Sequence, residues 1–533
     1  MPNLDPNDVD RVHHKLSAVI ELLLTLLPEE IQIVDNRPED KHAELAKNVA
    51  GLIDKLALNQ TALVHLTRVG TAKRLLGLLA HQNLRTNRPS LATQFARTLS
   101  RLTSYLPCAT EICKDKRYSP LIDYVMNHQE VKDKQQSRAL LNEVLSILVH
   151  MRESAPEFLD ILTPEMLQQL VSVLQEDKHP ASRNALRLVE AVSIYRPHLI
   201  FLSDTDLTEI LYKSIKIYPE APSTLANLIA HGNLGPKFFG EKNQEAIIEV
   251  LQGKDSDLIK ATLALVEALA RQERLNIEGA SQDKIDVNKV SKAIVVPLGS
   301  GISELAERAL DATIQLTLNF DHVNEDLLEI LDELTFGGRN RKAVLALAGT
   351  IHSAKEYSKW LEGPLISALV DMMEDEDNTL AEGAIKVISR FMHEGYGIDD
   401  MYYLGGVKTL GQVLRLALDP IAYIFPHTLN GRTRITLAAF DMIKTLAANE
   451  RTKEDIIRYD IINKVVLLTD SPRTYDIDDA AAKLLMGLES IDGHLATIIK
   501  KCIDENGRSE NETTKYAALD MFNPAVQTAP DTA

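Results

Sequence analysis

The sequence predicts an all-α protein in which short helical units stack into a solenoid. Three observations support this fold class. Leucine, alanine and isoleucine carry the apolar content, and aromatic residues make up only 5% of the chain, a composition that favours helices over sheets. An apolar anchor recurs at a nearly constant interval. Glycine or proline separates the short helices that lie between successive anchors.

Each unit closes with a helix in which an apolar pair is followed, two or three residues later, by a further apolar residue that we call the anchor. We place the anchors at Leu56, Leu102, Leu148, Val192, Leu228, Leu269, Leu316, Ile351, Phe391, Leu446 and Leu488. The ten intervals average about 43 residues, within the range of about 40 to 47 residues found in stacked helical repeats. About eleven repeats are therefore expected.

The first two elements are predicted from their caps and their apolar spacing. Asp5 can cap the first amides of a helix, and Pro6 suits the first helical position. An apolar stripe then continues to about Leu27. A second helix is predicted over 41–58.

Glycine marks the corners of the clearest later units. Gly70 and the pair Gly405-Gly406 each separate two apolar helices. The chain must turn steeply at such a corner, and glycine adopts a positive φ without a steric penalty. The corresponding turn near the end of the chain is expected at Asp460, which is a weaker substitute.

Two interruptions and a polar tail define the predicted domains. The stretch 273–300 is polar and irregular, so we interpret it as a hinge between N-terminal repeats over 1–272 and C-terminal repeats over 301–503. Residues 504–533 are polar and carry two prolines, which predicts a disordered tail.

The second interruption lies inside the tenth unit, where the interval between anchors is longest. A loop is expected over 418–433, and a closing helix from Arg434 to Asn449. Tyr423 and Phe425 lie in that loop between two prolines. They could wedge into a partner, or fold back and seal the core of their own repeat.

Composition and motifs argue against several classes of function. The net charge is -18, which opposes broad binding to nucleic acid or anionic membranes. No apolar run reaches the roughly 18 to 20 residues needed to span a bilayer. The three cysteines are too sparse for a metal site or a disulfide framework. No phosphate loop, nucleophile motif or zinc motif is present, so we expect no catalytic residue, no metal, no cofactor and no enzymatic activity.

Three phrases in the sequence resemble the armadillo-repeat superfamily. They are Asn59-Gln60-Thr61-Ala62-Leu63, Tyr403-Leu404-Gly405-Gly406-Val407 and Thr445-Leu446-Ala447-Ala448-Asn449. The resemblance covers most of residues 10–500, although the middle units are degenerate and equally HEAT-like. It implies a right-handed α-solenoid of about eleven degenerate armadillo/HEAT-like repeats, whose closing helices line a concave groove. Asn59, Asn319 and Asn449 share an offset of three residues after the anchor, and we interpret them as helix caps.

Peptide-binding members of the superfamily grip a peptide backbone with an asparagine just before each anchor. In this sequence only Asn227 matches that position, and Gln315 matches it in part. A nuclear-transport adaptor is therefore disfavoured. Basic residues instead recur on the closing helices: Lys55, Arg97, Arg101, Arg187, Lys386 and Arg390. They could select an acidic segment, or they could pair with carboxylates of adjacent units.

The sequence thus favours a non-enzymatic scaffold or adaptor, which binds a partner protein in the concave groove of the solenoid. The alternative is a chaperone-like or small-GTPase regulatory protein that holds an unstable client, similar to the GDP-dissociation stimulators or the UCS-domain myosin chaperones. The candidate binding residues are the six cations named above with Asn227, Gln315, Tyr423 and Phe425. We expect a cytoplasmic protein, with the nucleus as the alternative compartment. The sequence leaves the oligomeric state open.

Overall fold

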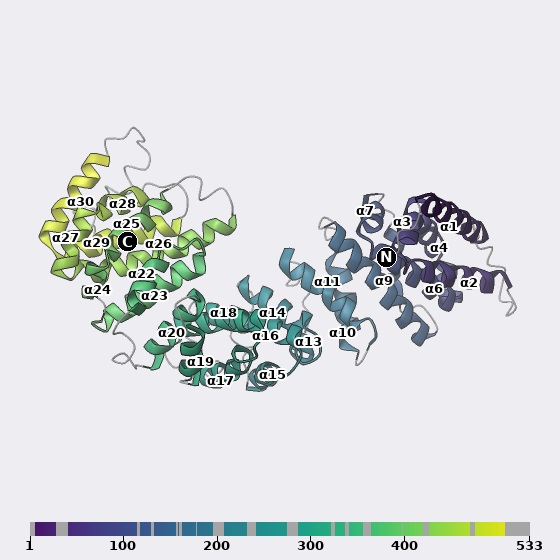
Figure 1. Cartoon of the computed structure of the whole chain (residues 1–533), viewed down its shortest axis with the longest axis horizontal. Helices are drawn as coiled ribbons and strands as arrows, with labels where there is room; N and C mark the ends of the chain where they lie inside the picture. Colours follow the sequence, from purple (N-terminus) through teal and green to yellow (C-terminus); the bar gives the residue numbers. More distant parts are fainter. Residues whose placement is uncertain are drawn as a thin grey trace, which may run out of the picture. The chain divides into compact units, whose positions relative to one another are not determined.

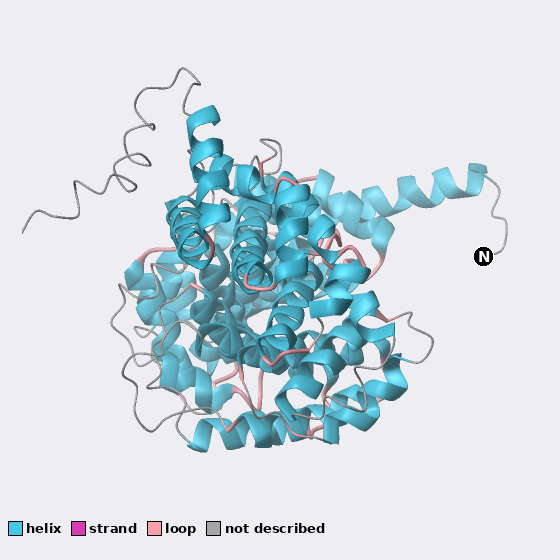
Figure 2. Ribbon diagram, turned by 90° about the vertical axis from the view of Figure 1, so that its left-hand side faces the viewer, coloured by secondary structure: helices cyan, strands magenta, loops and turns pink. Residues whose placement is uncertain are grey.

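The computed structural model describes most of the chain, and all of its elements there are helices (Figures 1 and 2). No strand occurs in the described residues. These are 6–27, 41–114, 118–128, 133–155, 158, 162–176, 179–195, 207–231, 241–273, 286–320, 324, 326–335, 340–354, 364–396, 398–418, 426–469 and 475–506. The chain divides into two compact units, Met1–Val250 and Leu251–Ala533.

The described helices of the first unit are 6 to 21 residues long. Its helices are α1 (Pro6–Leu26), α2 (Lys41–Leu56), α3 (Gln60–Arg68), α4 (Thr71–Leu79), α5 (Gln82–Asn87), α6 (Pro89–Thr103), α7 (Leu106–Lys114), α8 (Ser119–Asn127), α9 (Lys134–Ser154), α10 (Pro164–Gln175), α11 (Ser182–Tyr195), α13 (Leu207–Ser214), α14 (Glu220–Ala230) and α15 (Glu241–Leu251), which ends at the boundary.

In the second unit, one or two shorter helices lie between longer ones in the described part of the chain. Its helices are α16 (Ser256–Glu273), α17 (Val287–Leu298), α18 (Ser303–Asn319), α19 (Asp326–Thr335), α20 (Arg341–Ala354), α22 (Pro364–Met372), α23 (Asn378–His393), α24 (Ile398–Tyr403), α25 (Gly406–Ala417), α26 (Pro426–Ala447), α27 (Glu450–Arg458), α28 (Ile461–Thr469), α29 (Tyr475–Ile491) and α30 (Gly493–Asn506).

Every predicted anchor lies in the last turns of a different helix, and we call these eleven helices the ladder helices. They are α2, α6, α9, α11 and α14 in the first unit, and α16, α18, α20, α23, α26 and α29 in the second. Ten anchors are buried, and only Leu56 is partly exposed. Within each unit, every ladder helix packs against the next one. Because the anchors are buried where successive ladder helices pack, they belong to a core that runs along each unit. Burial of one large apolar side chain contributes about 1.5–3 kcal/mol to stability.

The predicted corners have the backbone geometry that they require. Gly70 and Gly405 have φ angles of 74° and 71°. Asp460 has φ 57° and is the only non-glycine residue with positive φ among those described. Asn59 and Asn449 are helix caps, as predicted, but each caps the helix that follows and has extended backbone. Their role therefore comes from the side-chain oxygen, which accepts from backbone amides of the next helix.

The prediction of a long loop over 418–433 is wrong for the second half of that range. Helix α26 begins at Pro426, so residues 426–433 are helical, and the closing helix starts eight residues earlier than Arg434. Proline is well suited to the first helical position because its missing amide hydrogen has no partner there. Tyr423 and Phe425 lie outside the described residues.

The domain division stays a prediction. Helix α17 occupies 287–298, inside the segment interpreted as a hinge, and packs on α18 and α19. The boundary between the compact units lies earlier, at Val250 and Leu251. Helix α30 continues through Asn506, so the first three residues of the predicted tail are helical, and 507–533 lie outside the described residues.

Candidate functional site

The arginines predicted on the early ladder helices are paired with carboxylates of neighbouring repeats. On α6, Arg101 Nε lies 2.7 Å from Asp54 Oδ1 on α2. One turn earlier on α6, Arg97 Nε lies 3.3 Å from Glu143 Oε1 on α9. The two arginines therefore link three successive ladder helices. Lys55, at the end of α2, is exposed.

A polar network joins α11 and α14 later in the first unit. Arg187 Nε and Arg183 Nε lie 3.1 Å and 3.2 Å from the same oxygen of Glu220, whose side chain is almost fully buried. One carboxylate thus faces two guanidinium groups. On the same pair of helices, Asn227 Nδ2 donates to Ser193 Oγ at 3.0 Å. The one asparagine at the predicted peptide-gripping position is therefore bonded to the neighbouring repeat.

Glu190 lies beside this network and has an unusual environment for an acid. Burial, reinforced by the nearby carboxylate of Glu220, raises the pKa of Glu190. A hydrogen bond with Ser223 and the charges of Arg152 and Arg187 oppose that shift. Charged groups of α11 and α14 thus form a network that connects two neighbouring repeats.

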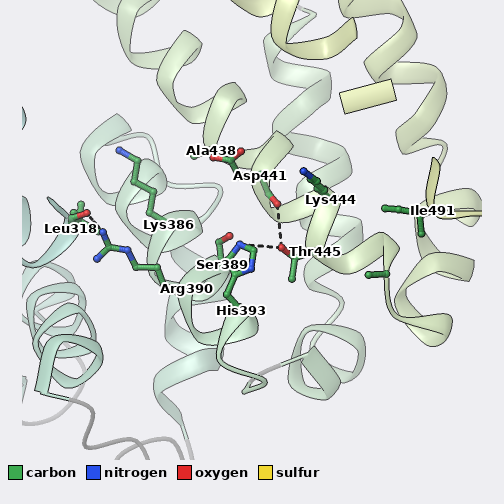
Figure 3. A pocket seen from close by; sticks show the side chains of 11 residues that line it. Leu318, Lys386, Ser389, Arg390, His393, Ala438, Asp441, Lys444, Thr445 and Ile491 are labelled. Atoms are coloured by element: carbon green, nitrogen blue, oxygen red, sulfur yellow. Dashed lines mark hydrogen bonds between the residues drawn. The ribbon is translucent and has the colours of Figure 1, made fainter. Parts of the chain in front are cut away.

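The second unit contains a pocket of about 550 Å³ that is lined by residues of its ladder helices (Figure 3). Four ladder helices line it: α18, α23, α26 and α29. The lining residues are Leu318, Lys386, Ser389, Arg390, His393, Ala438, Asp441, Lys444, Thr445, Ala448 and Ile491. Two of them, Arg390 and Thr445, directly precede an anchor. This volume lies within the range of about 300–1,000 Å³ typical of ligand pockets.

One wall of the pocket is cationic and comes from a single helix. Lys386, Arg390 and His393 follow one another at helical spacing along one face of α23. Lys386 forms an ion pair with Glu382 one turn earlier. Arg434 Nε on α26 lies 3.2 Å from the other oxygen of Glu382. The base of this wall is therefore an ion triad between α23 and α26.

Arg390 bridges to a ladder helix two repeats away. Its Nη1 donates to the carbonyl oxygen of Thr317 at 2.7 Å, and its Nη2 donates to the carbonyl oxygen of Leu318. Helix α18 ends at Asn319, so these carbonyl groups lack amide partners within the helix. A cation at the C-terminus of a helix is also favoured by the helix dipole. Arg390 thus caps α18 across the intervening helix α20.

Two glycines bring these helices close together. A Cβ atom on Gly349 of α20 would overlap the side chain of Thr317 on α18, and a Cβ atom on Gly383 of α23 would overlap Leu345 on α20. Both positions need a glycine because the neighbouring helix occupies the space that a side chain would take. Because α18, α20 and α23 pack this closely, the side chain of Arg390 on α23 can contact the end of α18.

The opposite wall of the pocket combines small residues with one lysine, Lys444, and one aspartate, Asp441. Ala438 and Thr445 lie on α26 and Ala448 directly follows that helix, and Thr445 Oγ1 lies 3.3 Å from His393 Nε2. Lys444 is exposed, and no carboxylate in the described part of the chain lies within ion-pair distance of its ammonium group. Ile491, at the end of α29, lies on the Lys444 side of the pocket (Figure 3).

Of the described residues predicted to bind a partner, only two line this pocket. Lys386 and Arg390 share the pocket, whereas Gln315 is buried on α18 and its carbonyl accepts from Asn319 at 2.8 Å. His393 and Lys444 were not predicted as site residues. Lys444 could have been found from its place beside Thr445, which occupies the position before the anchor Leu446.

Other kinds of site are not seen in the described residues. No group of three or more His, Cys, Asp or Glu residues there could hold a metal ion. Burial raises the pKa of the Cys108 thiol to about 12, which disfavours the thiolate that would bind a metal. Among the described helices, none is both long enough and apolar enough to cross a bilayer.

Comparisons with known proteins establish the fold but no family. No protein-family model matches the sequence, and no curated protein matches it. Among solved structures, the crystal structure of an engineered protein is 15% identical over 89% of this chain and 99% of that chain, with a TM-score of 0.47.

A second solved structure aligns more closely in space. It comes from work described as "A conserved phosphorylation switch controls the interaction between cadherin and beta-catenin in vitro and in vivo". It is 14% identical, covers 92% of this chain and 99% of that chain, and has a TM-score of 0.51. This likeness shows the fold: the chain is an all-helical, armadillo-like solenoid.

Proposed function

We propose that this protein is a non-enzymatic scaffold that binds a segment of a partner protein along the inner face of its ladder helices. One observation carries the proposal. The pocket in the second unit is lined by α18, α23, α26 and α29, so it belongs to the stacked array rather than to one repeat. Stacked repeats present a long surface of this kind, with a continuous core behind it.

The lining residues fit recognition of a chain segment. Polar and charged groups on α23 and α26 share the pocket with two exposed residues, Ala448 directly after α26 and Ile491 at the end of α29. A pocket with convergent polar groups on an apolar base fixes both the position and the orientation of a ligand. The compensated ion pairs of the first unit make its basic residues weaker candidates for the same role.

The proposal can be tested by site-specific photo-crosslinking. The photoreactive amino acid p-benzoylphenylalanine is placed at Ala448, which lines the pocket, in the full chain within cells that express it. The matched control places it at Leu416, which is also exposed but lies on α25 outside the pocket. We expect a protein crosslinked at Ala448 only, with the crosslink mapped to one segment of that partner. Equal crosslinking at both positions, or at neither, contradicts the proposal.

The chaperone-like or GTPase-regulatory alternative stays a prediction from the sequence. It depended on Tyr423 and Phe425, which lie outside the described residues. The cytoplasmic location also stays a prediction.

A further inference from the structure

We infer that the pocket receives an anionic side chain, a carboxylate or a phosphoryl group, from a partner segment that carries an apolar residue beside it. This inference rests on the proposed function and adds the chemistry of the partner. It follows from the charge of the pocket, from the position of Lys444 and from the apolar surface next to that lysine.

The charge of the lining opposes the charge of the whole protein. Lys386, Arg390 and Lys444 are cations, whereas Asp441 is the one carboxylate among the described residues that line the pocket. Arg434 and Glu382 contribute one further charge of each sign beneath this lining. The described residues of the pocket therefore carry a formal surplus of two positive charges in a chain of net charge -18. A local field of opposite sign selects a partner by electrostatic complementarity.

Lys444 is the cation best placed to meet an incoming anion. Its exposed ammonium group has no ion-pair partner in the described part of the chain, although Asp441 lies one turn earlier on the same helix. His393 and Arg390 lie across the pocket from Lys444 (Figure 3). An anion between α23 and α26 would thus meet positive charge from both walls.

The apolar part of the pocket specifies the neighbour of that anion. Ile491 is 39% exposed at the Lys444 side of the pocket (Figure 3), and Ala448, which also lines the pocket, is exposed. An apolar side chain placed there would remove this surface from water, which contributes roughly 25 cal/mol per Å². A basic segment would instead meet like charges, which costs affinity and provides selectivity.

The inference is tested with random dodecapeptides displayed on phage and selected on the full chain. We expect the enriched peptides to carry aspartate or glutamate next to an apolar residue. Selection on the Lys444→Glu variant should lose these peptides, whereas Lys408→Glu, at an exposed lysine on α25 outside the pocket, should retain them. Enrichment of neutral or basic peptides, no enrichment, or the same peptides on the Lys444→Glu variant overturns the inference.

A direct binding measurement then separates the two anionic groups. The most enriched peptide is synthesised with a fluorophore, together with a version in which glutamine replaces each acid and one in which phosphoserine does so. Fluorescence anisotropy should show that the glutamine version, or the Lys444→Glu protein, binds roughly tenfold more weakly, since an attraction is removed or replaced by repulsion. Lys444→Gln serves as a second variant and should weaken binding less. Tighter binding of the phosphoserine version identifies phosphoryl as the better ligand, and tighter binding of the acidic version identifies carboxylate.

If the glutamine version binds with the same affinity as the original acidic peptide, the inference is overturned.

The inference and the proposed function fail in different ways. Crosslinking at Ala448 to a partner segment without acidic or phosphorylated residues would support the scaffold function and contradict the inference of an anionic ligand. Selection of acidic peptides that depend on Lys444, with no crosslinking at Ala448 in cells, would support the chemistry of the pocket and contradict its use as a partner site.

Discussion

Arg390 donates a hydrogen bond of 2.7 Å to the backbone carbonyl of Thr317, a residue two ladder helices earlier in the chain. The guanidinium group therefore acts as the cap of α18 as well as part of the pocket wall. This relationship connects the stability of the array with the shape of the site, because the same side chain serves both.

Arg390→Ala should lower the free energy of unfolding by about 1.5–3 kcal/mol, the usual contribution of hydrogen bonds that involve a charged group. Removing the side chain leaves the carbonyl groups of Thr317 and Leu318 without a donor at the end of α18. Arg390→Lys should lose less, since one ammonium group can reach one carbonyl. Urea unfolding followed by circular dichroism measures the change. The control is Lys408→Ala, and a loss of equal size in that variant would contradict the capping role.

Gly349→Ala and Gly383→Ala should each destabilise the second unit by about 1–3 kcal/mol, because the new methyl group overlaps Thr317 or Leu345 and overpacks the contact. Gly487→Ala is the matched control. Gly487 lies inside helix α29, and the nearest atom to its added Cβ is 4.0 Å away, so the alanine should stabilise the helix by about 0.5–1 kcal/mol. Thermal unfolding distinguishes the two signs. Stabilisation by Gly349→Ala would show that α18 and α20 are not held this closely.

Stability should change in opposite directions when glycine is removed from one corner, at Gly405, and introduced at another, at Asp460. Gly405→Ala places a side chain at φ 71°, and the left-handed region costs an L-residue about 1–2 kcal/mol. Asp460→Gly relieves the same strain at φ 57°, although it removes the hydrogen bond that Asn463 Nδ2 donates to the Asp460 side chain at 3.1 Å. We therefore expect a clear loss of stability for Gly405→Ala and a neutral or stabilising effect for Asp460→Gly. A destabilisation in both variants would mean that side-chain bonding outweighs backbone strain at Asp460.

Stability should depend on pH through Glu190. Its pKa is raised in the folded protein by burial, so the folded state binds this proton more tightly than the unfolded state does. Its stabilising contribution is present below the ordinary pKa of a glutamate and is lost as the pH rises through the folded pKa. Glu190→Gln should therefore stabilise the protein at pH 7, and the gain should shrink as the pH falls toward the ordinary glutamate pKa. Melting curves at several pH values measure the gain. A gain that does not change with pH would exclude titration of Glu190 as its source.

The arginines of the first unit should matter for stability rather than for binding. Arg97→Gln together with Arg101→Gln removes two partly exposed ion pairs, each worth about 0.2–1 kcal/mol. We expect a small decrease in unfolding free energy and unchanged affinity for the acidic peptide selected on the full chain. If the double variant instead weakens peptide binding as strongly as Lys444→Gln does, the basic groove predicted from the sequence extends into the first unit.

The fold could be predicted because its determinants are local. The anchors follow from helical periodicity, and the corners at Gly70, Gly405 and Asp460 follow from the few residues that tolerate positive φ. The start of α26 at Pro426 was missed because proline was interpreted as a loop residue. At the first turn of a helix, proline is instead a favourable residue.

The site could be predicted only in part, because its charges are defined by contacts between repeats. Arg97 and Arg101 find their partners 46 and 47 residues away, about one repeat period, so opposite charges at that spacing are a signal that can be searched for. The bridge from Arg390 spans 73 residues and depends on how closely three helices approach. That approach is set by the missing side chains of Gly349 and Gly383, and no local pattern reports it.

The reach of Arg390 also bears on how the array unfolds. In a linear repeat protein, each repeat touches only its neighbours, and stability is close to a sum of repeat terms and nearest-neighbour terms. The contact between α23 and α18 adds a next-nearest-neighbour term. Repeats built on α18, α20 and α23 are therefore expected to open together as one cooperative block, and fraying from the C-terminal end should pause at α23. The wall that faces the ligand would then be the most persistent part of the second unit, which would keep its charges in place while the repeats beyond it fluctuate.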